Sequence, residues 1–284
     1  MSFKKYSTCV VLGVACLILS GFTMGGFRTP DSVLPDPATG HLFVSNINGS
    51  PTSADGNGFI SLLDTTGKPI NMHFIRSGQG SVHLNAPKGM ALMGGDLYVA
   101  DLRQIHRFDR TTGALKGTVD LGLIGAKNLS GLTPGPDGVL FAADPATSTV
   151  FTINTLNSHQ AAVHLRDREL GKPTALLYDP THNRLLVASW DHGRLFFIDS
   201  GRRVFALMKQ KFNRLKSLQF DRQGDLVFSS FVSGKIYRLK KYQTLEVVKE
   251  NLVTPGNFAL DKEGRRLVVP SFRGNIVFSA PLPY

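Results

Sequence analysis

The chain has 284 residues, of which 42% are hydrophobic, and it carries a formal net charge of +11. The apolar content is enough for a continuous core, and the charge favours anionic partners or surfaces, although ordinary solvated surface charge explains it as well. The chain has two cysteines, Cys9 and Cys16, which excludes a disulfide framework or a cysteine nucleophile in the residues that follow them.

Residues 1–25 are predicted to be a signal peptide. Lys4 and Lys5 precede an apolar run from Cys9 to Met24, and Gly25 adds a small residue where a signal peptidase can cut. An uncleaved membrane anchor is the alternative, and the run argues against it because it is shorter than the roughly 20 residues of a membrane span. Lipidation at Cys16 is disfavoured because the apolar run continues beyond it. We therefore expect an exported protein, periplasmic or secreted, which contacts a membrane only through this segment if it stays uncleaved.

A short apolar phrase occurs six times in the rest of the chain. Its copies are LFVSN at Leu42, LYVAD at Leu97, LFAAD at Leu140, LLVAS at Leu185, LVFSS at Leu226 and LVVPS at Leu267. They start 55, 43, 45, 41 and 41 residues apart, a period that is typical of the blades of a propeller. The sequence therefore predicts an all-β fold, with a single six-bladed β-propeller domain over residues 26–284.

Each repeat is expected to contain four strands, with the phrase as the second. The phrases are almost continuously apolar, as expected where neighbouring blades cover both faces of a sheet. In the first repeat a polar insertion, residues 47–58, separates the second and third strands, and inserted polar loops often carry function. After Ser279 few residues remain, so the last blade either lacks its outer strand or borrows one from residues just after the signal.

The repeat also predicts two rings of equivalent positions on one face of the propeller. The inner-strand ring leads into the innermost strands and consists of Asp31, Lys88, Ser130, Thr174, Lys216 and Asn257. The second-strand ring ends the phrases and consists of Asn46, Asp101, Asp144, Ser189, Ser230 and Ser271. Trp190, Phe231 and Phe272 directly follow the last three of these.

A face with one polar and one aromatic wall suits a small molecule or a peptide. The expected ligand-binding residues are Asp31, Asn46, Lys88, Asp101, Ser130, Asp144, Thr174, Trp190, Lys216, Phe231 and Phe272. The alternative is structural: the polar residues cap turns and the aromatic residues seal the packing between blades.

With its blades aligned, residues 27–279 resemble the SMP-30/gluconolactonase/luciferin-regenerating family of six-bladed propellers, and more loosely the NHL-like propellers. The segments that carry the resemblance are DSVLPDPATGHLFVSNINGSP, APKGMALMGGDLYVAD, GPDGVLFAAD, LLYDPTHNRLLVASW and GKIYRL. The resemblance implies the fold more strongly than it implies a function.

For the lactonases of that family, the resemblance implies one divalent cation, held by a Glu, an Asn and an Asp at three inner-strand positions, the Asp also acting as a base. The matching positions here are Asp31, Ser130 and Thr174, so Asp31 is the one candidate metal ligand with a carboxylate. A hard divalent cation needs several oxygen ligands, and the lysines of the same ring would repel it. A shift in the alignment would bring Asn128 toward the site instead.

No other catalytic signature is present in the sequence. The eight histidines show no metal-ligand spacing, and there is no nucleophile elbow, phosphate-binding loop or dinucleotide fingerprint. The basic stretch around residues 209–216 is a weak sign of nucleic-acid binding, and export argues against that partner.

Two hypotheses of function remain. In the first, the protein is a binding or scaffold module with a degraded metal site and no cofactor. It is expected to be a monomer, and its partner is a small molecule, a peptide or a protein at the channel mouth. In the second, it is a metal-dependent lactonase-type hydrolase with a rearranged site that uses calcium, magnesium, manganese or zinc. A purely structural role within an assembly is a third possibility.

Overall fold

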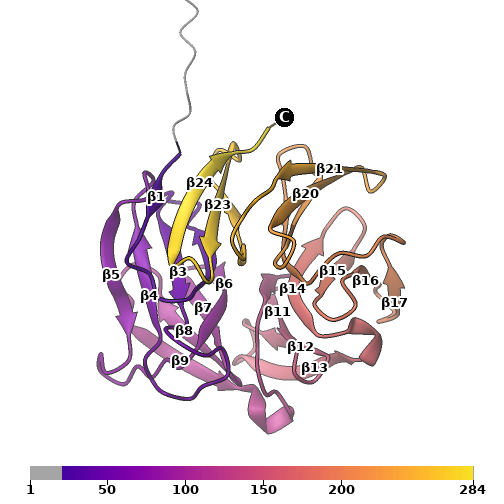
Figure 1. Ribbon diagram of the computed structural model, residues 1–284. Helices are drawn as coiled ribbons and strands as arrows, with labels where there is room; N and C mark the ends of the chain where they lie inside the picture. Colours follow the sequence, from indigo (N-terminus) through magenta and orange to yellow (C-terminus); the bar gives the residue numbers. More distant parts are fainter. Residues whose placement is uncertain (1–20, 284) are drawn as a thin grey trace, which may run out of the picture.

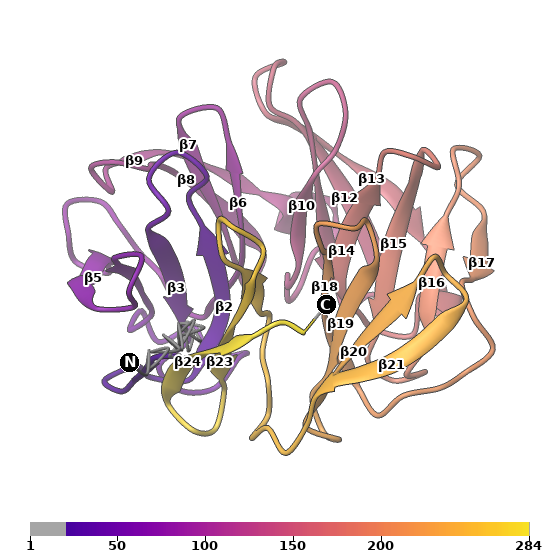
Figure 2. The same cartoon turned by 90° about the horizontal axis from the view of Figure 1, so that it is seen from above.

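The computed structural model describes residues 21–283 and forms a six-bladed β-propeller (Figures 1 and 2). Each blade is a four-stranded antiparallel sheet. The only helical elements in this part of the chain are two short 3-10 turns, η1 (Leu121–Ile124) and η2 (Arg168–Leu170). The predicted fold class is confirmed.

The first three blades follow one another in the chain. Blade one contains β2 (Pro30–Pro35), β3 (Leu42–Asn46), β4 (Phe59–Leu63) and β5 (Pro69–Arg76). Blade two contains β6 (Pro87–Met93), β7 (Asp96–Asp101), β8 (Gln104–Asp109) and β9 (Leu115–Asp120). Blade three contains β10 (Leu132–Pro134), β11 (Val139–Asp144), β12 (Thr149–Asn154) and β13 (Gln160–Arg166).

The last three blades complete the ring. Blade four contains β14 (Pro173–Asp179), β15 (Arg184–Ser189), β16 (Leu195–Ile198) and β17 (Val204–Ala206). Blade five contains β18 (Leu215–Phe220), β19 (Leu226–Ser230), β20 (Lys235–Lys240) and β21 (Thr244–Lys249). Blade six contains β22 (Ala259–Leu260), β23 (Arg266–Ser271), β24 (Ile276–Pro281) and β1 (Thr23–Met24).

The repeated phrase forms the second strand of every blade, as predicted. Every residue of β3 and of β19 is buried, because both faces of these strands pack against neighbouring blades. The buried apolar residues form six clusters, and each cluster lies between two adjacent blades. The cluster between blades six and one, for example, joins Val44 to Val268. Burial of apolar surface between blades is therefore what holds the ring together.

The predicted insertion separates β3 from β4 in blade one. β3 ends at Asn46 and β4 begins at Phe59. Within the insertion, Asn48 donates from Nδ2 to the carbonyl oxygen of Asn57, and Gly56 N donates to Asn85 Oδ1 of blade two. These bonds fix the loop against the next blade.

The ring closes at two radii. At the centre, Asn257 of blade six donates from its backbone N to Asp31 O (2.7 Å), and Val33 N donates to Asn257 O (3.0 Å). At the periphery, β1 pairs antiparallel with β24, so that Thr23 lies opposite Phe278. In Figure 1 the first strand (indigo) runs beside the last (yellow). Of the two alternatives for the last blade, the structure shows the borrowed outer strand.

That strand lies inside the segment that we assigned to the signal peptide. Most of the predicted signal, residues 1–20, lies outside the described residues. The part from Gly21 to Gly25 contains β1, and Phe22 and Met24 pack against the cluster between blades six and one. The propeller therefore begins before residue 26. In the described part of the chain, no helix is long and apolar enough to span a membrane.

A truncation tests this closure. A protein that starts at Gly26 lacks β1 and the Phe22 side chain, whereas one that starts at Gly21 keeps both. Because burying a large apolar side chain contributes about 1.5–3 kcal/mol, we expect the shorter form to be about 2 kcal/mol less stable to urea unfolding. Equal stability of the two forms would show that β1 contributes nothing to closure.

Candidate functional site

A cavity of about 300 Å³ opens at the mouth of the central channel. It lies where the loops that lead into the innermost strands meet the loops that leave the second strands. Its lining residues are Asp31, Pro51, Lys88, Asn128, Ser130, Pro145, Lys172, Thr174, Trp190, Arg214, Lys216, Phe231, Phe272 and Arg273. Eight of the eleven predicted ligand-binding residues are in this set, and we refer to it as the mouth cavity.

The three other predicted residues belong to the second-strand ring, and their side chains are used inside the protein. They accept from backbone donors: Arg28 N donates to Asn46 Oδ1 (3.0 Å), Asn85 N to Asp101 Oδ2 (2.7 Å) and Lys127 N to Asp144 Oδ2 (2.6 Å). The other three members of the ring are serines, and their hydroxyls donate to backbone carbonyl oxygens. Ser189 bonds Gly171 O, Ser230 bonds Asn213 O and Ser271 bonds Val253 O, at 2.7 Å each. In every blade the second strand thus holds the loop that leads into the same blade. Asn46, Asp101 and Asp144 do not line the mouth cavity, and they match the structural alternative instead.

Asp101 shows how strongly these ties hold. Its carboxylate accepts from the backbone N of Asn85 and of Ala86 (2.7 Å each), and the His106 Nε2 lies 3.5 Å from it. Burial acts to raise the pKa of Asp101, but His106 and the two backbone donors outweigh that effect and leave the pKa below its ordinary value. The loop before β6 is therefore fixed by a charged, multiply bonded group.

The floor of the mouth cavity is built from the inner-strand ring. Lys216 Nζ lies 2.9 Å from Asp31 Oδ1. Both residues are buried: Lys216 has 8% of its surface exposed and Asp31 has 2%. Lys88, which is 3% exposed, donates to the carbonyl oxygen of Ala86 (3.2 Å) and to Asn128 Oδ1 (3.0 Å). Among residues 21–283, Lys88 forms no ion pair with a carboxylate. The floor thus holds one neutralised pair and one lysine with neutral partners.

The environment of Lys88 disfavours its charge. Burial lowers the pKa of Lys88 from 10.5 to about 8. The carboxylates of Asp31, Asp101 and Asp144 offset part of this effect, and the nearby Lys216 adds to it.

The two hydroxyl positions of the same ring join neighbouring blades. Ser130 Oγ donates to Thr174 O (3.0 Å), and Thr174 Oγ1 donates to Leu215 O (2.7 Å). These hydroxyls therefore already serve as donors to the protein's own backbone. Together with an Asp31 that is engaged by Lys216, they are a poor fit for a divalent cation, which prefers charged oxygen ligands. Residues 21–283 contain no group of three or more His, Cys, Asp or Glu side chains placed to hold a metal ion.

An aromatic wall rises from this floor over blades four to six. The ring centroids of Trp190 and Phe231 are 5.1 Å apart, and those of Phe231 and Phe272 are 5.7 Å apart. The Arg214 guanidinium lies over the Trp190 ring at 5.4 Å. Contacts of this kind hold the rings in place and leave an apolar surface toward the cavity.

Sequence analysis missed most of the cationic rim. Lys172 and Arg214 each lie two residues before a member of the inner-strand ring, so the same repeat, read two positions earlier, would have found them. Asn128 occupies the matching position in blade three, and the shifted alignment had already brought it toward the site. Pro51 comes from the insertion in blade one, and Arg273 follows Phe272. The repeat spacing marks these equivalent positions, but it does not show how far each loop extends around the cavity.

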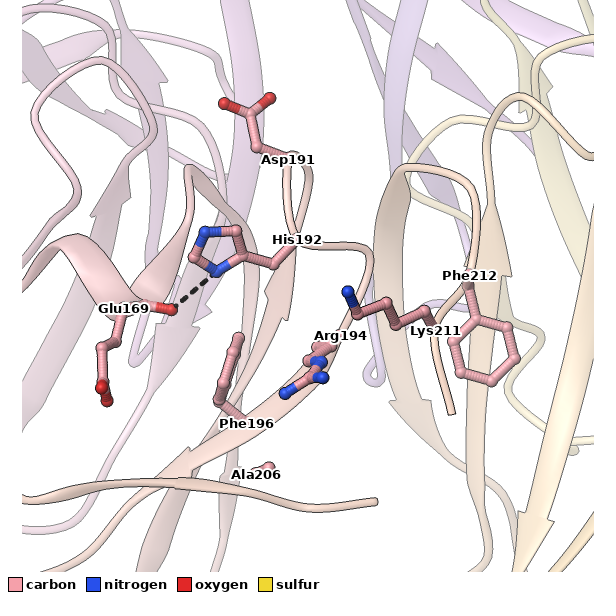
Figure 3. Close-up of a pocket in the computed structure, with 8 residues that line it drawn as sticks. All are labelled: Glu169, Asp191, His192, Arg194, Phe196, Ala206, Lys211 and Phe212. Carbon is pink, nitrogen blue, oxygen red and sulfur yellow. Dashed lines mark hydrogen bonds between the residues drawn. The ribbon is translucent and has the colours of Figure 1, made fainter. Parts of the chain in front are cut away.

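A larger cavity of about 710 Å³ lies away from the ring positions, at the flank of blade four (Figure 3). His192 Nδ1 lies 3.1 Å from the carbonyl oxygen of Glu169, and Arg194 and Lys211 line the same space. The adjacent Asp191 carboxylate is paired with Lys172 at 2.8 Å. None of the predicted site residues lines this cavity, so we take the mouth cavity as the candidate site.

No protein-family model and no curated protein matches the chain. Among solved structures, it is similar to a catalytically inactive virginiamycin B lyase from Staphylococcus aureus with quinupristin, with 13% identity and a TM-score of 0.64 over 93% of this chain and 89% of that one. A streptogramin B lyase structure gives 12% identity and a TM-score of 0.60 over 91% of this chain and 97% of that one.

An auxiliary nutrient binding protein from Bacteroides thetaiotaomicron gives 11% identity and a TM-score of 0.68, over 90% of this chain and 69% of that one. At these identities the likeness shows the propeller fold alone. Membership of the family that the sequence resembles stays a prediction.

The buried Lys88 should lower the stability of the protein at neutral pH. Because one pKa unit corresponds to about 1.4 kcal/mol, we expect Lys88→Met to stabilise the protein at pH 7, by up to about 3 kcal/mol. Between pH 8 and 10.5 the unfolded chain binds the lysine proton more than the folded one does, so this cost disappears as the pH rises.

Urea unfolding of both proteins at pH 7 and pH 10 measures this difference. Lys127→Met, which removes an exposed lysine, is the matched control and should change stability little at either pH. A Lys88→Met protein that is less stable at pH 7 would contradict the assignment of a charged, costly Lys88.

Proposed function

We propose that the protein is an exported propeller that binds a small molecule or a peptide in the mouth cavity, without a catalytic metal. The observation that carries this proposal is the ion pair between Lys216 and Asp31, which engages the carboxylate that a metal site would need. The N-terminal sequence supports export. Propellers of this fold include a protein described as nutrient binding as well as lyases, so the fold accommodates a binding role.

The mouth cavity has the features of a small-ligand site. Its volume of about 300 Å³ lies at the lower end of the roughly 300–1,000 Å³ typical of such sites. It combines an apolar wall with a few polar groups that are held by the fold. The ties of the second-strand ring and the bonds between blades make this arrangement rigid before any ligand binds, which lowers the cost of binding.

Metal titration separates the binding role from the lactonase alternative. We expect calorimetry with calcium, magnesium, manganese and zinc to show no stoichiometric binding, and we expect no metal-dependent lactone hydrolysis. Lys216→Ala should also bind none, because a single freed carboxylate is insufficient. Tight stoichiometric metal binding with turnover would restore the lactonase hypothesis.

Trp190 provides a direct test of binding, because it is the only tryptophan of the chain. Compounds and short peptides that bind in the mouth cavity should change its fluorescence, and Phe231→Ala should weaken their binding at least tenfold. Phe205→Ala, which removes an exposed ring on β17, is the matched control. Ligands that bind equally to all three proteins would lie elsewhere.

A further inference from the structure

We infer that the ligand of the mouth cavity is a small organic anion with an apolar body, such as a carboxylate on a short chain that bears one aromatic ring. The inference rests on the proposed function, and it names the class of ligand for the same cavity. Its basis is the way in which charge and apolar surface are divided between the floor, the wall and the rim.

The lining carries a strong excess of positive charge. Five of the lining side chains are cationic, namely Lys88, Lys172, Arg214, Lys216 and Arg273, and Asp31 is the one carboxylate. Lys216 neutralises Asp31 at 2.9 Å, and Lys172 is paired with Asp191 at 2.8 Å. Lys88, Arg214 and Arg273 have no carboxylate partner within residues 21–283. The field in the cavity therefore favours an anion and repels an amine.

Lys88 marks the place for the anionic group. Of the two buried lysines of the floor, Lys216 has a carboxylate partner, whereas the described partners of Lys88, Ala86 O and Asn128 Oδ1, are both neutral. Those two acceptors leave one of its three N–H donors for a ligand. A carboxylate at this point would give the lysine the counter-ion that the protein does not supply, and a buried charge-assisted bond of this kind is a strong one.

The aromatic wall defines the rest of the ligand. Trp190, Phe231 and Phe272 form a continuous apolar surface, and Pro51 and Pro145 also line the cavity. A ring attached to the carboxylate through a short chain can stack against this wall while the anionic group reaches the floor. A strongly hydrated ligand without an apolar body would leave the wall uncovered, so a simple anion such as acetate should bind weakly.

The volume limits the size of the ligand. A cavity of about 300 Å³ accommodates a single ring with a short acid chain, and a larger ligand would have to extend past the rim. At the rim, Arg214 and Arg273 are exposed and can attract the anion during its approach without holding it. Steering by the rim and binding at the floor are therefore separate contributions.

The test uses the full-length protein with three probes: 3-phenylpropionate, its neutral amide 3-phenylpropionamide, and acetate. Trp190 fluorescence and calorimetry measure the dissociation constants. We expect 3-phenylpropionate to bind at least tenfold more tightly than the amide, and acetate to bind weakly. Lys88→Met should remove this preference, with little effect on the amide, and Lys127→Met, which removes an exposed lysine outside the cavity lining, should keep it.

Each outcome separates the ligand class from the binding role. If the amide binds as tightly as the acid, or if Lys88→Met keeps the preference while its melting curve shows a folded protein, the anionic class is wrong and the binding role stands. If none of the probes binds while neutral compounds change Trp190 fluorescence, the class is again wrong. If no compound of any charge binds, the proposed function fails as well.

Discussion

The side chain at the end of each second strand holds the loop that leads into the same blade, and the shape of the mouth depends on these six ties. They span 16 to 18 residues of sequence in every blade. Their chemistry differs: Asn46, Asp101 and Asp144 accept from backbone N–H groups, whereas the serines of the other blades donate to carbonyl oxygens. Because each tie pairs a buried side chain with a backbone group of the loop, removing one would leave that donor or acceptor unpaired next to the candidate site.

The ties also explain how one ring can be structural while its neighbours face a ligand. With the second-strand ring engaged inside the protein, the cavity is left to the inner-strand ring and to the aromatic residues that follow the ties. The two lysines of the inner-strand ring differ in their partners: Lys216 has a carboxylate partner, and Lys88 has only neutral ones. The floor is therefore asymmetric, with its unbalanced positive charge on the side of blade two.

The sequence alone was sufficient for the blade number, the strand phase and the cavity side of the inner-strand ring, because six phased copies of one phrase fix equivalent positions. It was insufficient for Asp101 and Asp144, because an acidic residue at a strand end can face a ligand or a backbone N–H, and only the path of the loop decides. Nor did it show the ion pair of Asp31 with Lys216, since these residues are 185 positions apart in the chain. The borrowed closing strand was expected just after residue 25 and lies earlier, because Thr23 and Met24 also fit the composition of a signal segment.

Closure by β1 sets an order on the assembly of the protein. Phe22 N donates to Ser279 Oγ, and these two residues are separated by 257 positions. During synthesis, therefore, the strand that finishes blade six is made before every other strand of the propeller and its partner β24 after them, so the ring stays open until all six blades have been synthesised. Until then the edge of the incomplete sheet is exposed to pairing with other strands. The nascent protein thus depends on the other blade interfaces, which form between consecutive parts of the chain, to persist until its two ends meet.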